Sequence, residues 1–163
     1  MVVLGIDPGS RVTGFAAISK KSNRFQLLEA GCIKTQTSES IPLRLLTIRT
    51  GLVEVIERIS PSEAAIESIF TYKSAESALR LGQARGVALV TLAEKGLKVT
   101  DYNPMVVKKN IAGNGRAGKS EMQRIVARLL GLEKPLTSDA ADAAAIAMTH
   151  LLHSTFYSRI KKQ

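Results

Sequence analysis

The chain has 163 residues, and its 23 Lys and Arg outnumber its 14 Asp and Glu to give a formal net charge of +9. This length can bury one substantial core without disulfides, and the single cysteine, Cys32, excludes a disulfide framework. No apolar run approaches the ~20 residues that span a bilayer, so the sequence predicts a cytoplasmic protein with no membrane-spanning segment. Its basic surface favours a polyanionic partner such as nucleic acid over a small metabolite.

Runs of apolar and β-branched residues predict three β-strands at the start of the chain, over residues 2–7, 12–19 and 24–33. A polar turn joins the second strand to the third, so the chain begins as an antiparallel meander. The first strand ends at Asp7, and Pro8 and Gly9 then force the chain to reverse. The Asp7 carboxylate is therefore presented at a strand end, where such a residue usually caps a turn, binds a cation or takes part in chemistry.

Helices and strands alternate through the rest of the chain, as apolar spacing and the placement of proline, asparagine and glycine indicate. The predicted elements are, in order, a helix from Pro42 to Ile59, a strand from Ala64 to Phe70, a helix over 74–95, a strand from Leu97 to Tyr102, a short basic helix after Asn103-Pro104, a basic helix over 119–130 and an alanine-rich helix over about 138–153. This order predicts an α/β fold with a mixed five-stranded sheet flanked by helices. We expect one domain over 1–155 and a flexible basic tail over 156–163.

Four acidic residues stand at the ends of these elements, namely Asp7, Glu67, Asp139 and Asp142. If the fourth strand pairs in parallel beside the first, the ~4.8 Å strand spacing brings Glu67 close to Asp7. Asp139 and Asp142 are three residues apart at a helix start, which turns both side chains toward one face. Converging carboxylates raise one another's pKa unless cations lie among them, and Mg²⁺ prefers oxygen ligands. The pattern predicts a divalent-metal site, in which two ions would suit hydrolysis of a phosphodiester.

Each acid also has a purely structural interpretation: a turn cap, a solvent-facing edge residue or acids at a helix N-terminus. What favours the metal site is their combination with a basic surplus over residues 104–134, where seven Lys and Arg face two Glu. A non-catalytic DNA-binding module, in which the acids are only structural, remains the alternative outside enzymes.

Four segments resemble the RuvC family of bacterial Holliday-junction resolvases, namely Gly5-Ile6-Asp7-Pro8-Gly9-Ser10-Arg11-Val12-Thr13-Gly14, Ala65-Ile66-Glu67, Leu81-Gly82-Gln83-Ala84-Arg85-Gly86 and Asp139-Ala140-Ala141-Asp142-Ala143. The similarity extends from residue 2 to about residue 153. It implies an RNase H-like fold, a homodimer, and Mg²⁺-dependent paired nicking of four-way DNA junctions during recombination and repair, beside the branch-migration proteins RuvA and RuvB.

The resemblance also implies roles for individual residues. The family's four catalytic carboxylates match Asp7, Glu67, Asp139 and Asp142, which would hold two Mg²⁺ per subunit, with Mn²⁺ as a substitute. Some family members have histidine in the last helix where this chain has aspartate, so the site here is all carboxylate. Phe70 would stack on an unpaired base, unless it is a core aromatic, and Tyr72 suits either role. Basic residues expected to contact the DNA backbone are Lys108, Lys109, Arg116 and Lys119, of which Lys119 would also steady the scissile phosphate.

Two other motifs suggest nucleotide chemistry. Residues 113–120 fit the pattern G-x-x-x-x-G-K-S, but no apolar strand is predicted before them and none ending in a Walker B aspartate after them. Asp7-Pro8-Gly9 followed by Gly14 is also similar to the phosphate-binding hairpin of actin-like ATPases and sugar kinases, which need two such domains. That class is the alternative enzyme. His150 and His153 are left without a role, and Gly82 and Gly86 favour close helix packing, either across a dimer or against the sheet.

Overall fold

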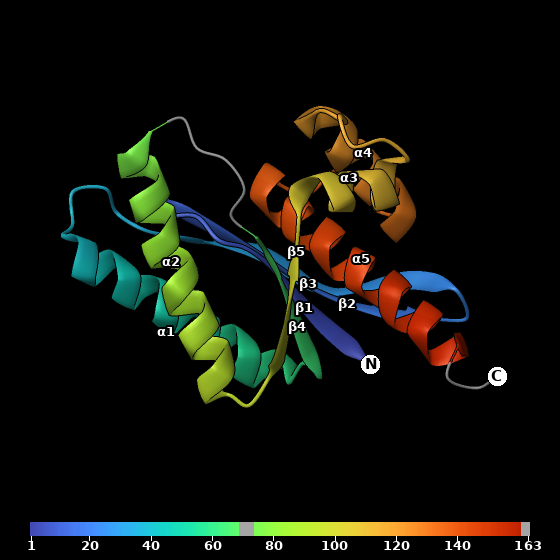
Figure 1. Ribbon diagram of the computed structural model, residues 1–163, viewed down its shortest axis with the longest axis horizontal. Coiled ribbons are helices and arrows are strands. Elements are labelled where there is room, and N and C mark those ends of the chain that lie inside the picture. Colours follow the sequence, from blue (N-terminus) through green and yellow to red (C-terminus); the bar gives the residue numbers. More distant parts are fainter. Residues whose placement is uncertain (69–73, 161–163) are drawn as a thin grey trace.

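The computed structural model describes residues 1–68 and 74–160, and it arranges them as a sheet between two helical layers (Figure 1). The strands are β1 (Val2–Asp7), β2 (Val12–Lys21), β3 (Arg24–Lys34), β4 (Glu63–Glu67) and β5 (Lys98–Tyr102). They lie in the order β3-β2-β1-β4-β5. The first three pair antiparallel, while β4 is parallel to both β1 and β5, which confirms the predicted mixed five-stranded sheet.

The helices are α1 (Ile41–Ile59), α2 (Ala75–Glu94), α3 (Pro104–Ala112), α4 (Lys119–Leu130) and α5 (Ser138–Ile160). In Figure 1, α1 and α2 cover one face of the sheet, and α5 crosses the other face beneath α3 and α4. The alternation of strand side chains produces these two faces. Val3 and Ile18 are buried with α3, α4 and α5, whereas Leu4 and Ile6 are buried with α1 and α2.

Helix α5 packs very closely against the first two strands. A Cβ atom on Gly5 would overlap the carbonyl oxygen of Ala143, and one on Gly14 would overlap that of Asp139. The facing side of α5 is rich in alanine, and the helix is buried continuously from Ala143 to Leu151. Glycine on the strands and alanine on the helix therefore allow the α5 backbone to approach the sheet more closely than larger side chains would.

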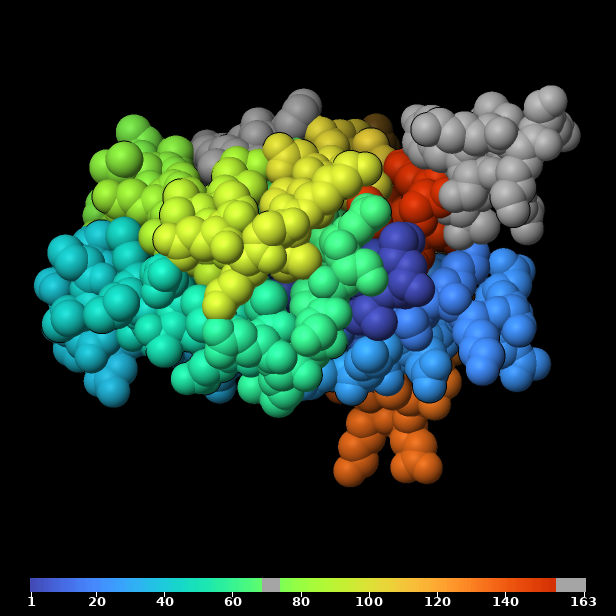
Figure 2. Space-filling view, turned by 90° about the horizontal axis from the view of Figure 1, so that it is seen from below, coloured from blue at the N-terminus to red at the C-terminus, as the bar shows by residue number. Residues whose placement is uncertain are grey.

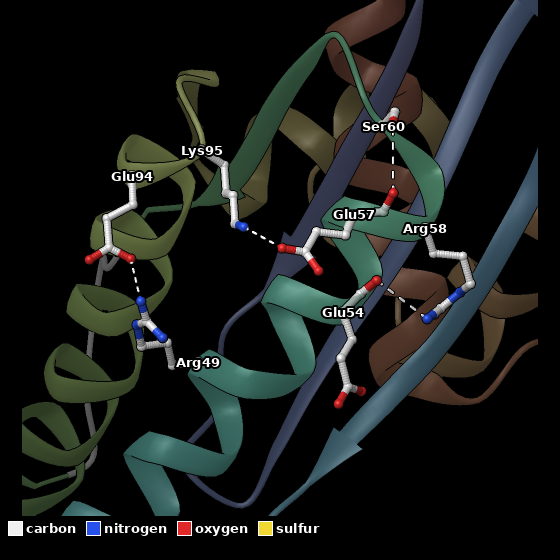
Figure 3. Close-up of polar contacts among 7 residues, drawn as sticks. All are labelled: Arg49, Glu54, Glu57, Arg58, Ser60, Glu94 and Lys95. Atoms are coloured by element: carbon white, nitrogen blue, oxygen red, sulfur yellow. Dashed lines mark hydrogen bonds and ion pairs between the residues drawn. The ribbon is translucent and has the colours of Figure 1, made fainter.

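Ion pairs link α1 and α2, the two helices on one face of the sheet, at their surface. Figure 2 shows α1 and α2 side by side as one continuous surface, and the segment near residue 130, in orange, extends beyond the lower edge of the molecule in this view. Between the two helices, Arg49 lies 2.7 Å from the Glu94 carboxylate and Lys95 lies 2.6 Å from Glu57 (Figure 3). Such exposed pairs are each worth at most about 1 kcal/mol, so the buried apolar side chains between the helices and the sheet hold this layer in place.

The structure differs from the expected elements at two boundaries. The fourth strand ends at Glu67 and not at Phe70, which lies outside the described residues. Its neighbour β5 ends at Tyr102, because Asn103 and Pro104 begin α3, so strand pairing stops there. At the other end of the chain, α5 continues to Ile160, beyond the expected end near residue 153. In the part of the chain that the structure describes, no helix is both long and apolar enough to span a membrane.

Candidate active site

Two of the four predicted acids meet at the ends of neighbouring parallel strands. The register of β1 and β4 pairs Ile6 with Ile66, so Asp7 and Glu67 follow side by side as the last residues of their strands. The two carboxyl groups interact, because burial and then the charge of Glu67 raise the pKa of Asp7. The conditional prediction that the fourth strand pairs in parallel beside the first is therefore confirmed.

The turn after Asp7 is held by a buried arginine. The Arg44 side chain, only 4% exposed, donates from Nε to Thr35 Oγ1 at 3.2 Å and from Nη2 to the Ser10 carbonyl oxygen. Thr13 Oγ1 donates to the Gly9 carbonyl oxygen at 3.0 Å. Sequence reasoning missed Arg44, although it stands four residues before Ile48 on the buried stripe of α1 and so interrupts an apolar pattern with a charge.

The last helix brings the second pair of acids to the same end of the sheet. Asp142 lines a cavity of about 250 Å³ together with Asp7 and Glu67. Asp139 stands one turn earlier on α5, where its backbone packs on Gly14, and its charge acts on both Asp7 and Asp142. Asp139 is not among the residues that line the cavity. The four acids are thus gathered as predicted, with Asp139 at the margin.

Burial and mutual repulsion raise the pKa of these acids. Burial, followed by the charges of Glu67, Asp142 and Asp139, raises the pKa of Asp7 to about 8, against a lowering by Lys119. The pKa of Glu67 is raised by burial and then by Asp142, and the pKa of Asp142 is raised by burial, with Asp139 adding to the shift. Positive charge among these carboxylates would stabilise their ionised forms.

Two of the predicted basic residues supply part of that charge. Lys108 from α3 and Lys119 from the first turn of α4 line the cavity, and both lower the pKa of Glu67 and Asp142. Lys109 and Arg116 are exposed and lie outside the cavity lining. Phe70 and Tyr72, the predicted base-stacking residues, lie outside the described residues.

The donor set suits a hard divalent cation. All four acids offer oxygen, the ligand that Mg²⁺ prefers, and two lysines leave their negative charge only partly offset. Among residues 1–68 and 74–160, no three His, Cys, Asp or Glu side chains form a ready-made metal cage. The fit therefore rests on the chemistry and convergence of the carboxylates around the cavity.

A larger cavity of about 660 Å³ lies along the edge strand β5. His150, which is 5% exposed, accounts for one of the two histidines left without a role: its Nδ1 lies 3.1 Å from Tyr102 Oη and its Nε2 lies 2.8 Å from Glu63 Oε2. His153 Nε2 lies 2.9 Å from Asn110 Nδ2. Both histidines thus have hydrogen-bonding partners, and of the four predicted acids none lines this cavity.

The glycine-rich segment over 113–120 connects two helices, because α3 ends at Ala112 and α4 begins at Lys119. A P-loop instead joins a strand to a helix. The resemblance to the nucleotide-binding pattern is therefore coincidental in this fold.

Comparison with known proteins gives a consistent result. Residues 3–150 match the model of the family described as crossover junction endodeoxyribonuclease RuvC. The chain is 45% identical to the crossover junction endodeoxyribonuclease RuvC of Geobacter sp. (strain M21), over 99% of this chain and 98% of the relative. It is also 45% identical to the protein of the same name from Francisella tularensis subsp. novicida, over 98% of this chain and 93% of the relative.

Solved structures agree with these relatives. T. thermophilus RuvC in complex with a Holliday junction substrate superposes with a TM-score of 0.87 at 39% identity, covering 99% of this chain and 96% of that one. The yeast mitochondrial Holliday junction resolvase Ydc2 superposes with a TM-score of 0.69 at 17% identity, covering 99% of this chain and 85% of that one, a likeness that shows the fold alone. The RNase H-like fold is therefore confirmed. Together with the match over nearly the whole chain, it shows that this chain belongs to the RuvC family of crossover junction endodeoxyribonucleases.

Proposed function

We propose that the protein resolves four-way DNA junctions by hydrolysing one phosphodiester in each of two opposed strands, during recombination and repair in the cytoplasm. The observation that carries this proposal is the convergence of Asp7, Glu67 and Asp142 with Lys119 around one cavity at the strand ends. The solved relative bound to a Holliday junction supports the choice of substrate.

We propose Asp7, Glu67, Asp139 and Asp142 as the ligands of two Mg²⁺ per subunit, which Mn²⁺ can replace. Bound there, the ions would neutralise the carboxylates and supply the Lewis acidity that phosphodiester hydrolysis needs. Asp7 and Glu67 lie centrally because they end adjacent strands, whereas Asp139 and Asp142 approach from α5. The carboxylates are also suited to orient the attacking water by accepting its hydrogen bonds.

The lysines act on the DNA. Lys119 lines the cavity, and its ammonium would donate to a phosphate oxygen at the reacting centre, where added negative charge develops in the transition state. Lys108 would neutralise the adjoining backbone, with Lys109 and Arg116 extending this contact outward. Phe70 and Tyr72 follow Glu67 within five residues, and we propose that they stack on bases that are unpaired at the crossover.

A homodimer matches the approximate two-fold symmetry of a four-way junction. A partly apolar face of α2 supports such pairing: Leu79 and Val90 are 63% and 57% exposed, and a Cβ on Gly82 or Gly86 would meet nothing within 4 Å. These glycines are therefore not used for packing against the sheet, which leaves pairing across a dimer as their proposed use. RuvA and RuvB are the proposed partners in branch migration.

The test is incubation of end-labelled four-way junction and of matched linear duplex, each with Mg²⁺, with Mn²⁺ and with chelator. We expect symmetric nicks in the junction only, and only with a divalent ion. Junction binding should weaken steeply with salt, because lysine contacts to phosphate release counterions. Binding without cleavage under every divalent ion would contradict the proposal and favour a non-catalytic DNA-binding module.

A further inference from the structure

One arginine on the far side of the sheet reaches the backbone of a proposed catalytic acid. Arg85 of α2 donates from Nε to the carbonyl oxygen of Glu67 at 3.1 Å and from Nη2 to Asp101 Oδ1 at 2.7 Å. Its side chain is 17% exposed. The guanidinium therefore bridges the ends of β4 and β5 with two of its donors, a geometry to which the planar fork of arginine is better suited than an ammonium group.

The hydrogen bond from Arg85 to Glu67 lies at the point where the pairing of β4 with β5 ends. The Ser68 N–H donates to the Tyr102 carbonyl oxygen at 2.9 Å, and β5 then gives way to α3. The Glu67 carbonyl oxygen has its partner in Arg85. Two consecutive backbone groups at the end of β4 are thus held, one by the neighbouring strand and one by α2. Because side chains alternate across a strand, the backbone orientation at Glu67 decides whether its carboxylate points toward Asp7.

Arg85 lies on the opposite side of the sheet from the groups that act on the Glu67 carboxylate. Apart from Asp7 of the neighbouring strand β1, those groups are Asp142, Lys108 and Lys119, which belong to the layer of α3, α4 and α5. Arg85 belongs to the layer of α1 and α2, and its contact with Glu67 is to the main chain. Its influence on the site therefore passes through the position of the backbone.

We propose that Arg85 is a positioning residue for Glu67: by holding the Glu67 carbonyl oxygen and Asp101 together, it keeps the Glu67 carboxylate aligned with Asp7 and Asp142 for divalent-ion binding and cleavage. This inference rests on the proposed function. Arg85 of α2 thus contributes to a site that lies on the other side of the sheet.

The test compares Arg85→Gln, Arg85→Lys and Asp101→Asn with the wild type. A residue that holds a metal ligand in place typically contributes ~10–100-fold in ion affinity or activity, so Arg85→Gln should lower the single-turnover rate of junction cleavage by that amount. It should also raise the Mg²⁺ concentration for half-maximal rate. Arg85→Lys should recover part of the loss, and Asp101→Asn, which leaves the bond to Glu67, should lose less than Arg85→Gln.

Two measurements separate positioning from other causes. Junction affinity in chelator should stay within about twofold of the wild type, since Arg85 makes no proposed DNA contact. The rise in melting temperature on adding Mg²⁺ should be smaller in Arg85→Gln than in the wild type, which reports ion binding without any cleavage. The matched control is Arg49→Gln, which removes an α1–α2 ion pair (Figure 3) without touching a strand end and should behave as the wild type.

Wild-type cleavage and Mg²⁺ dependence in Arg85→Gln would overturn the inference. Parallel losses of junction binding and melting temperature with unchanged Mg²⁺ dependence would also overturn it, because Arg85 would then serve DNA contact or folding. Failure of the wild type itself to cleave would instead contradict the proposed function, so the two failures can be told apart.

Discussion

Asp7 is the acid whose environment opposes its charge most strongly. Burial and three neighbouring carboxylates favour its protonated form, and only Lys119 among the named charges opposes them. Such an arrangement costs stability in the absence of cations and is expected where a site is built for function and not for folding. The site can therefore be tested without measuring cleavage, by following the stability of the protein as pH changes or as Asp7 is replaced.

We predict that Asp7→Asn stabilises the protein in chelator, and increasingly so as pH rises. The pKa of Asp7 is about 8 in the folded chain against 3.8 for an ordinary aspartate, so between these values the folded state keeps a proton that the unfolded state releases. The free energy of unfolding of the wild type therefore falls with rising pH across this window, and asparagine removes that dependence.

Thermal and denaturant unfolding at pH 5 and pH 9 measure this effect. The advantage of Asp7→Asn should reach several kcal/mol at pH 9, because the pKa of Asp7 is raised from 3.8 to about 8 and each unit of raised pKa costs about 1.4 kcal/mol in the charged form. It should be much smaller at pH 5. An Asp7→Asn protein that is less stable than the wild type at pH 9 would show that Asp7 contributes favourable contacts that outweigh its repulsion.

Lys119 should matter more for the chemical step than for binding. Lys119→Gln removes the cavity-lining ammonium, and loss of one group that stabilises transition-state charge typically costs ~10²–10³-fold in rate. Single-turnover cleavage should fall by this amount while junction affinity falls only a fewfold. Lys21→Gln, at the far tip of the β2–β3 hairpin, is the control. Equal losses in rate and affinity would reduce Lys119 to an ordinary phosphate contact.

The four acids could be predicted from the sequence because each stands at a boundary marked by local chemistry, such as Pro8 and Gly9 after Asp7. Their partners could not be predicted in the same way. Arg44 and Arg85 bond to backbone oxygens that are 34 and 18 residues away in the chain, and no local pattern specifies an acceptor at that separation. The marginal place of Asp139 likewise depends on how α5 lies on the sheet.

The contact of α5 with β1 and β2 delivers the second pair of acids. Between Ala140 and Leu151 this helix is buried on nearly all sides between the sheet and α3 and α4, so the apolar residues there surround the helix rather than forming one stripe. The sequence predicts the helix and the common face of Asp139 and Asp142, but not which strands it crosses. The glycines that reveal the crossing, Gly5 and Gly14, resemble ordinary strand irregularities until the helix is seen against them.

We predict that Gly14→Ala separates Asp139 from Asp7 and damages both stability and cleavage. The new methyl group would overlap backbone atoms of Asp139, which cannot rotate away as a side chain can. Overpacking of this kind costs about 1–3 kcal/mol or more, measurable by denaturant unfolding. Thr50→Ala is the control: Thr50 is exposed on α1, where alanine should leave stability unchanged or raise it slightly because alanine favours the helix. Unchanged stability in Gly14→Ala would mean that α5 is less tightly seated than the structure shows.

The two helical layers on opposite faces of the sheet contribute differently to the site. The layer of α3, α4 and α5 supplies Asp139, Asp142 and the lysines, and the layer of α1 and α2 holds the strand ends and presents the open face of α2. The three-layer order followed from the alternation of elements along the chain, as predicted. The open face could not be deduced, because exposure of Leu79 and Val90 depends on where α2 lies.

We predict that Val90→Glu disrupts subunit pairing. Placing a charge in the middle of an apolar helix face that pairs with its copy should shift the protein from dimer to monomer in sedimentation. Junction cleavage should then change from paired, symmetric cuts to isolated nicks at a lower rate. Leu28→Glu, a comparable exposed apolar position on β3, should leave the dimer intact. A dimer that persists in Val90→Glu would move the interface away from this face of α2.

The decisive measurement is junction cleavage and junction binding by Asp7→Asn, Glu67→Gln and Asp142→Asn, beside the wild type, with Mg²⁺ present. If these carboxylates form one divalent-ion site, each variant binds the four-way junction as well as or better than the wild type, because repulsion of phosphate falls, and each cleaves at least ~10²-fold more slowly. A variant that binds and cleaves like the wild type would remove its carboxylate from the site, and wild-type cleavage by all three would contradict the carboxylate mechanism.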